Sequence, residues 1–164
     1  MAKLKKQHMT IHWKAIVQDD SSIPATEATL KEKATLVGRI GLMMLSVGTG
    51  AWRVRNSMNK VSRCLGITCT ADIGLLAISY TCIEGTDTYT QSISLPTTGV
   101  NTHKLMELEL FMKEFPDKVS TYSVKHIHEV LDEIQKLPAN YQAWNLGLAS
   151  ALACGAFTFL LGGG

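Results

Sequence analysis

The chain has 164 residues, enough for one compact domain and a short appendage but not for two domains. Its formal net charge of +2 is small, so the overall charge does not indicate a nucleic-acid-binding protein. All sixteen Lys and Arg and all fourteen Asp and Glu lie at or before Lys136, so residues 137–164 carry none of these charges. This segregation argues against a wholly soluble protein.

Residues 1–28 are expected to form a mobile, basic and polar lead-in. No apolar run follows its lysines, so the pattern of a secretory signal peptide is missing and we expect the amino-terminal domain in the cytoplasm. The four cysteines have neither CxxC nor zinc-ligand spacing. Reduced, buried thiols are therefore expected at Cys64, Cys69, Cys82 and Cys154.

Residues 29–138 predict a cytoplasmic α+β domain. Its first helix begins near Thr29, which is followed by Glu32 in the spacing of a capping box, and it runs to about residue 47. Apolar residues at three- and four-residue steps form the buried stripe of this helix, which leaves Lys33 and Arg39 for water. A second helix ends at Gly66. Its buried face consists of Val54, Met58, Val61 and Leu65.

The middle of the domain predicts short antiparallel strands between residues 67 and 95. The stretch 84–87, "EGTD", separates two runs rich in Thr, Ile and Tyr and indicates a hairpin. Two further helices follow. The third is capped by Asn101 or Thr102 and ended by Pro116, and the fourth spans about residues 123–136.

Residues 141–164 predict a transmembrane helix and the start of the following loop. The stretch 144–161 has 18 residues without a charge, close to the roughly 20 that cross a bilayer core. Tyr141 and Trp144 at its near end, with Lys136 before them, place the amino terminus on the cytoplasmic side. The alternative is a buried core helix. Small residues four apart would admit a neighbouring helix on a face formed by Gly147, Ala151 and Gly155.

Few residues suggest a chemical site. The chain lacks GxSxG, HExxH, P-loop and GxGxxG motifs, so no catalytic residue, metal or cofactor is predicted. His126 and His128 are two residues apart on a helix and diverge, so we expect surface positions for both. Asn101 and His103 stand where a helix begins and its free N–H groups favour a carboxylate, which makes them candidate contacts to a small zwitterion. The alternative is simple helix capping.

Two motifs, taken in order, resemble the threonine/serine exporter family. "GTGAWRVRNSMNKVSRCLGI" covers residues 48–67 and "TTGVNTHKLMELELF" covers residues 97–111, and the tail from Trp144 to "LLGGG" follows. The likeness extends over about residues 30–164. The matching positions are Gly50, Arg53, Val54, Leu65 and Gly66 in the first motif and Gly99, Val100 and Asn101 in the second.

The resemblance implies a cytoplasmic α+β domain ahead of several membrane helices in the plasma membrane. Members of the family are expected to use the proton gradient to expel threonine, serine or four-carbon dicarboxylates, and to assemble as oligomers in the lipid bilayer. The chain departs from the pattern at Arg55, where the family usually has an acidic residue, and in the β-region, which lacks a Thr-Pro-Thr-like turn. One span cannot enclose a polar substrate, so further helices of the same or a partner chain are required.

The sequence therefore predicts the amino-terminal part of a secondary transporter, with its domain capping or gating the cytoplasmic mouth. Two alternatives remain open. One is a membrane-tethered binding or regulatory domain without transport of its own. The other is a hydrolase-like domain, which would need a buried nucleophile beside His103 or His128.

Overall fold

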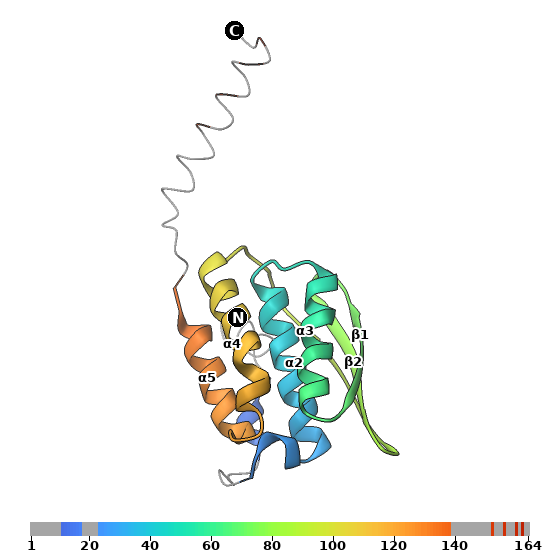
Figure 1. Cartoon of the computed structure of the whole chain (residues 1–164). Helices are drawn as coiled ribbons and strands as arrows, with labels where there is room; N and C mark the ends of the chain where they lie inside the picture. Colours follow the sequence, from blue (N-terminus) through green and yellow to red (C-terminus); the bar gives the residue numbers. More distant parts are fainter. Residues whose placement is uncertain are drawn as a thin grey trace.

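A computed structural model describes residues 11–17 and 23–138, together with positions 152, 156, 160 and 162 (Figure 1). Two 3-10 turns, η1 (Trp13–Ala15) and η2 (Ala25–Glu27), precede helices α2 (Leu30–Ser46) and α3 (Ala51–Cys64). Strands β1 (Thr68–Ile73), β2 (Ala77–Glu84) and β3 (Asp87–Ser94) follow, and then α4 (Thr102–Lys118) and α5 (Val124–Lys136). The predicted α+β class and the order of these elements are confirmed.

The described domain has three layers (Figure 1). The strands form one antiparallel sheet in the order β1-β2-β3, and α2 and α3 cover one of its faces. Helices α4 and α5 pack on the other side of α2 and α3. Helix α2 therefore lies between two layers, and all its residues from Glu32 to Leu45 are buried.

Local signals fix most element boundaries as predicted. Thr29 and Glu32 form a capping box at the start of α2. Gly66, at φ 73°, ends α3, and the backbone N–H of Ile67 reaches back to the carbonyl of Ser62 in the manner of a Schellman motif. Gly85, at φ 60°, provides the hairpin turn between β2 and β3.

The prediction that Lys33 and Arg39 face water is wrong. Both are buried, with exposed fractions of 3% and 5%, because the central position of α2 leaves it no wet face. The ammonium group of Lys33 lies 2.6 Å from a carboxylate oxygen of Glu84 on β2. A buried charge needs such a partner, and periodicity within one helix could not reveal a partner on another element.

The prediction that Pro116 ends its helix is also wrong, because α4 continues to Lys118. Proline has no N–H to donate to the carbonyl four residues earlier, which here belongs to Met112. The Lys60 ammonium, from α3, donates to that carbonyl at 2.8 Å. A neighbouring helix thus replaces the hydrogen bond that Pro116 cannot make.

Candidate functional site

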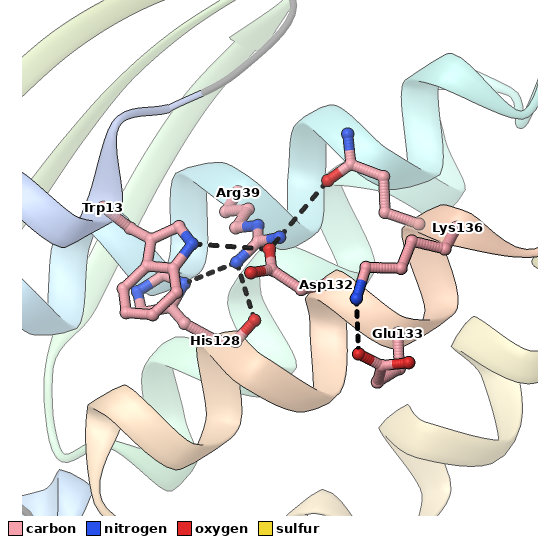
Figure 2. Close-up of polar contacts among 7 residues, drawn as sticks. Trp13, Arg39, His128, Asp132, Glu133 and Lys136 are labelled. Carbon is pink, nitrogen blue, oxygen red and sulfur yellow. Dashed lines mark hydrogen bonds and ion pairs between the residues drawn. The ribbon is translucent and has the colours of Figure 1, made fainter.

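A polar cluster in the interior surrounds Arg39 in the middle of α2 (Figure 2). Its Nη1 donates to the backbone carbonyl of His128 at 2.8 Å and lies 3.1 Å from the Nδ1 of the same residue. Its Nη2 donates to the Asp132 carboxylate and, at 3.2 Å, to Gln135 Oε1. Burial lowers the pKa of Arg39, and the contact with Asp132 opposes that effect. Four guanidinium donors thus meet acceptors on α5.

His128 is the second buried member of this cluster and is fully inaccessible to solvent. Burial, and then the nearby Arg39 cation, lower the pKa of His128 to about 3. Because a guanidinium N–H faces Nδ1, that nitrogen accepts and the ring proton belongs on Nε2. The Nε2 atom has no hydrogen-bond partner in the described part of the chain.

Trp13 fastens the lead-in to this cluster. Its indole stacks on the His128 imidazole at a centroid distance of 4.8 Å and an interplanar angle of 8°, and it is only 7% exposed. The indole Nε1 also donates to Asp132 at 3.4 Å. The sequence predicted a mobile lead-in over residues 1–28, and it gave no sign of this anchor because η1 is one short turn without an apolar period.

The prediction that His128 lies on the surface is wrong, whereas His126 is exposed as expected. The two rings do diverge, and for that reason only one of them faces α2. A sequence signal existed, because His128, Asp132 and Gln135 recur at helical steps on α5, and an arginine inside the apolar run of α2 needed a polar partner.

A pocket of about 350 Å³ adjoins the cluster, and we call it the Arg39 pocket. Its lining includes the apolar side chains of Trp13, Leu42 and Met43 and the polar side chains of Arg39, Asp132 and Gln135. The Asp132 side chain is 31% exposed, so its carboxylate is accessible to water as well as to Arg39. The arrangement could hold a small molecule with an apolar body and a polar group.

A second pocket of about 380 Å³ opens at the amino end of α4, and we call it the Asn101 pocket. It shares Leu42, Met43 and Gln135 with the Arg39 pocket. The remaining lining residues mix polar and apolar side chains: Ser46, Leu95, Thr97, Thr98, Gly99, Val100, Asn101, Lys104 and Leu108. The structure thus brings one predicted contact residue, Asn101, to the wall of a cavity.

Asn101 caps α4 as well. Its Oδ1 accepts a hydrogen bond from the backbone N–H of Lys104 at 3.1 Å, which leaves the amide NH₂ available to donate. His103, the other predicted contact, is not among the residues that line this pocket. Its Nδ1 is buried without a hydrogen-bond partner in the described residues. The structure therefore does not place the two candidate side chains on one wall.

The other family-motif positions have structural roles. Gly50 caps α3, Val54 and Leu65 are buried in the core, and Gly66 provides the left-handed turn after it. The motif around Gly99 is hydrogen-bonded to the end of α2: the Gly99 N–H donates to the carbonyl of Ser46 at 3.2 Å. The two motifs therefore meet at one end of the domain.

Charged positions of the first motif also find partners. Arg53 forms a surface ion pair with Glu109 of α4. Arg55, which replaces the acidic residue usual in the family, donates from Nε to the carbonyl of Ala71 in β1 at 3.1 Å. Arg55 thus links α3 to the sheet through this hydrogen bond.

The enzymatic alternative would need a nucleophile beside His103 or His128. Within the described residues, His128 is hydrogen-bonded to Arg39 and stacks on Trp13, and neither of these residues is a nucleophile. No cluster of three or more His, Cys, Asp or Glu suited to a metal ion occurs in the same part of the chain.

Cys69 and Cys82 are buried free thiols on paired positions of β1 and β2. Contact with Cys69, and then burial, raise the pKa of Cys82, so its thiol stays protonated.

Most of the predicted membrane segment lies outside the described residues, including Tyr141, Trp144 and the packing face of Gly147, Ala151 and Gly155. Leu152, Ala156 and Leu160 are described, and all three are helical and exposed. Among the helices that the structure does describe, none combines the length and apolar character needed to cross a bilayer.

Comparison with protein families agrees with the motifs. A family model described as "Putative threonine/serine exporter" matches residues 35–164, which is most of the chain. The chain belongs to the threonine/serine exporter family. Comparison with curated proteins gave no significant match, and comparison with solved structures gave none either. Membership supports a transport role of the threonine/serine export type and a location at a membrane.

Proposed function

We propose that residues 29–138 form the cytoplasmic domain of a proton-coupled exporter of small polar metabolites such as threonine and serine. Family membership supports the transport role. The Asn101 pocket supports a more specific role, because it lies at the end of the domain where α5 leads toward the uncharged residues 137–164. In this proposal the domain caps the cytoplasmic mouth of the transport pathway.

The chemistry of the Asn101 pocket suits the carboxylate end of an amino acid. The amide NH₂ of Asn101, the first N–H groups of α4 and the Lys104 side chain supply donors and positive charge. Ser46, Thr97 and Thr98 line the same space and can exchange hydrogen bonds with a substrate hydroxyl. Leu95 and Leu108 provide apolar surface for a methyl group such as that of threonine.

The proposed membrane part completes the transporter. In it, residues 141–164 form the first membrane helix and the start of the following loop, and the small-residue face of Gly147, Ala151 and Gly155 packs on neighbouring helices of the same or a partner chain. Several helices are needed, because a polar substrate must be shielded from lipid along its whole path.

The site is tested by threonine efflux from cells that carry the complete transporter. Asn101→Asp retains a side chain that caps helices but replaces the amide donor with a negative charge. We expect the KM for threonine to rise at least about tenfold, which corresponds to about 1.4 kcal/mol of lost binding. His103→Ala is measured in parallel. Unchanged efflux in Asn101→Asp and Asn101→Ala would refute the assignment.

A control substitution at another helix cap separates an effect on substrate binding from an effect on folding. Ser123 caps α5 by accepting from the backbone N–H of His126 at 3.2 Å, and it is not among the residues that line the Asn101 pocket. Ser123→Ala therefore removes a comparable cap, at a cost of about 1 kcal/mol of stability, without touching the proposed contact. Its KM for threonine should equal that of the unmodified transporter.

One observation favours the alternative of a tethered regulatory domain. The Arg39 pocket is a second cavity, built around a buried arginine, and it could hold a small molecule that is not transported. Under that alternative, efflux by the complete protein would not depend on Asn101, whereas substitutions of Asp132 or Gln135 would alter its regulation.

A further inference from the structure

One end of the domain is formed by three loops that contain no charged residue: 47–51, 74–76 and 95–101. Backbone hydrogen bonds between strands and loops bring these three loops close together. Ala77 of β2 pairs with Ser94 of β3, and the Leu95 N–H donates to the carbonyl of Leu76 at 2.7 Å. The Gly99 N–H in turn donates to the carbonyl of Ser46, at the end of α2. We call this end of the domain the loop face (Figure 1).

The loop face exposes large apolar side chains. Trp52, at the start of α3, is 70% exposed, Leu75 is 85% exposed and Val100 is 81% exposed. Two of them lie over the first loop: a Cβ at Gly50 would be 3.7 Å from the Trp52 indole, and a Cβ at Gly48 would be 3.3 Å from the Val100 side chain. Two loops and the first turn of α3 thus expose apolar side chains at this end of the domain.

The opposite end of the domain has a different character. There the β2–β3 turn carries Glu84 and Asp87, and Lys33 of α2 pairs with Glu84. On the two helices that begin at the loop face, the first charged residue is basic in each case, Arg53 in α3 and Lys104 in α4. Arg53 is paired with Glu109, and the acidic Asp72 stands two positions before the loop 74–76, so the border carries both signs of charge whereas the three loops carry none.

The chain itself indicates what covers the loop face. Helix α5 ends there, because Gln135 and Asn101 line the same pocket. Lys136 is the last charged residue, and the 18-residue uncharged stretch 144–161 begins eight positions later. A segment of that composition and length belongs in a bilayer, so the loop face is the end of the domain nearest to the membrane.

We infer that the loop face rests in the headgroup layer of the bilayer, with Trp52, Leu75 and Val100 as its contacts. This inference relies on the proposed membrane placement of the chain. Tryptophan favours the interface, and uncharged loops avoid the cost of desolvating a charge. Apolar side chains from two loops and the start of a helix suit a fluid layer, which requires no fixed shape from its partner.

Contact between the loop face and the bilayer would also determine how the Asn101 pocket is oriented relative to the membrane. Val100 belongs both to the loop face and to the pocket lining. A domain seated on this face would therefore hold the pocket next to the membrane surface, where substrate passes from the cytoplasm to the transmembrane pathway.

Spin labels on the full chain in vesicles of phosphatidylcholine and phosphatidylglycerol test this inference. Single labels are placed through Leu75→Cys and Val100→Cys, with Thr86→Cys at the opposite end of the domain as the control, after replacement of Cys64 and Cys154 by serine. We expect the ratio of oxygen to nickel-complex collisions to be several-fold higher at positions 75 and 100 than at position 86.

The other outcomes overturn the inference in distinguishable ways. Equal, water-like accessibility at all three positions would show that the loop face stays in solution. Low accessibility to both oxygen and nickel at positions 75 and 100 would show coverage by protein instead of lipid. Failure of the chain to float with the vesicles would refute the membrane placement in the proposed function, and the inference with it.

Discussion

The indole of Trp13 stacks on the imidazole of His128, with the rings 4.8 Å apart and within 8° of parallel. This contact joins the amino-terminal turn η1 to α5 and closes one side of the cluster around Arg39. A residue from the lead-in thereby covers part of a half-buried ion pair that joins two helices of the domain.

Removal of this anchor should destabilise the domain. Trp13→Ala deletes a buried aromatic side chain and is expected to lower the free energy of unfolding by about 3 kcal/mol. Hydrogen exchange should also quicken over residues 11–17. Trp52→Ala is the matched control, since its side chain is 70% exposed, and it should change the unfolding free energy little. Equal effects of the two substitutions would contradict the packing described here.

The geometry of the Arg39 cluster requires a guanidinium. Arg39→Lys keeps the positive charge but cannot reach acceptors on His128, Asp132 and Gln135 together, so we expect a loss of about 2 kcal/mol in denaturant unfolding. The control is Arg53→Lys, which alters an ion pair whose side chains are both more than 40% exposed. Its effect should remain below about 0.5 kcal/mol. If Arg39→Lys left the free energy of unfolding unchanged, the cluster would not be formed.

His128 should make stability depend on pH. Its ordinary pKa is 6.5 and its pKa in the folded domain is about 3, so between these values the unfolded chain binds a proton that the folded domain does not. Stability therefore falls as the pH falls through this window. Between pH 7 and pH 5 the expected loss at this site is about 2 kcal/mol.

His128→Gln isolates this contribution, because its amide oxygen can still accept from Arg39 while the side chain does not titrate. The free energy of unfolding of this variant should change less between pH 7 and pH 5. The matched control is His126→Gln, two residues away on the exposed side of α5, which should keep the full pH dependence. The burial of His128 would be refuted if both variants matched the unmodified domain.

Gly38 is required by the packing of α2 on the sheet. A Cβ at this position would lie 2.7 Å from Cε1 of Tyr80, whose hydroxyl is held by Gln91 Oε1 at 2.9 Å. Gly38→Ala should therefore lower the unfolding free energy by about 2 kcal/mol, although alanine favours a helix by about 1 kcal/mol. Gly99→Ala meets no atom within 4 Å and should be nearly neutral. Thermal unfolding of the two variants measures the contrast.

The sequence predicted the features that short-range rules control. Capping by Thr29 and Asn101, the turn at Gly85 and the apolar faces of the helices each depend on residues a few positions apart. These rules gave the α+β order and one wall residue of the Asn101 pocket.

The features that the sequence did not predict depend on contacts between residues far apart in the chain. The carbonyl left free by Pro116 is satisfied by Lys60, 52 residues away from Met112. Burial of Arg39 depends on Asp132, which lies 93 residues further along the chain. No local periodicity contains such pairs, so Arg39 and His128 were both assigned to the surface.

In the proposed function, this domain serves the export of threonine-like metabolites. The most direct measurement is threonine transport into or out of proteoliposomes that hold the complete transporter, with an imposed proton gradient. We predict gradient-driven threonine movement that Asn101→Asp reduces and Ser123→Ala leaves unchanged. Threonine movement no faster than in empty vesicles would contradict the claim and favour a tethered regulatory domain.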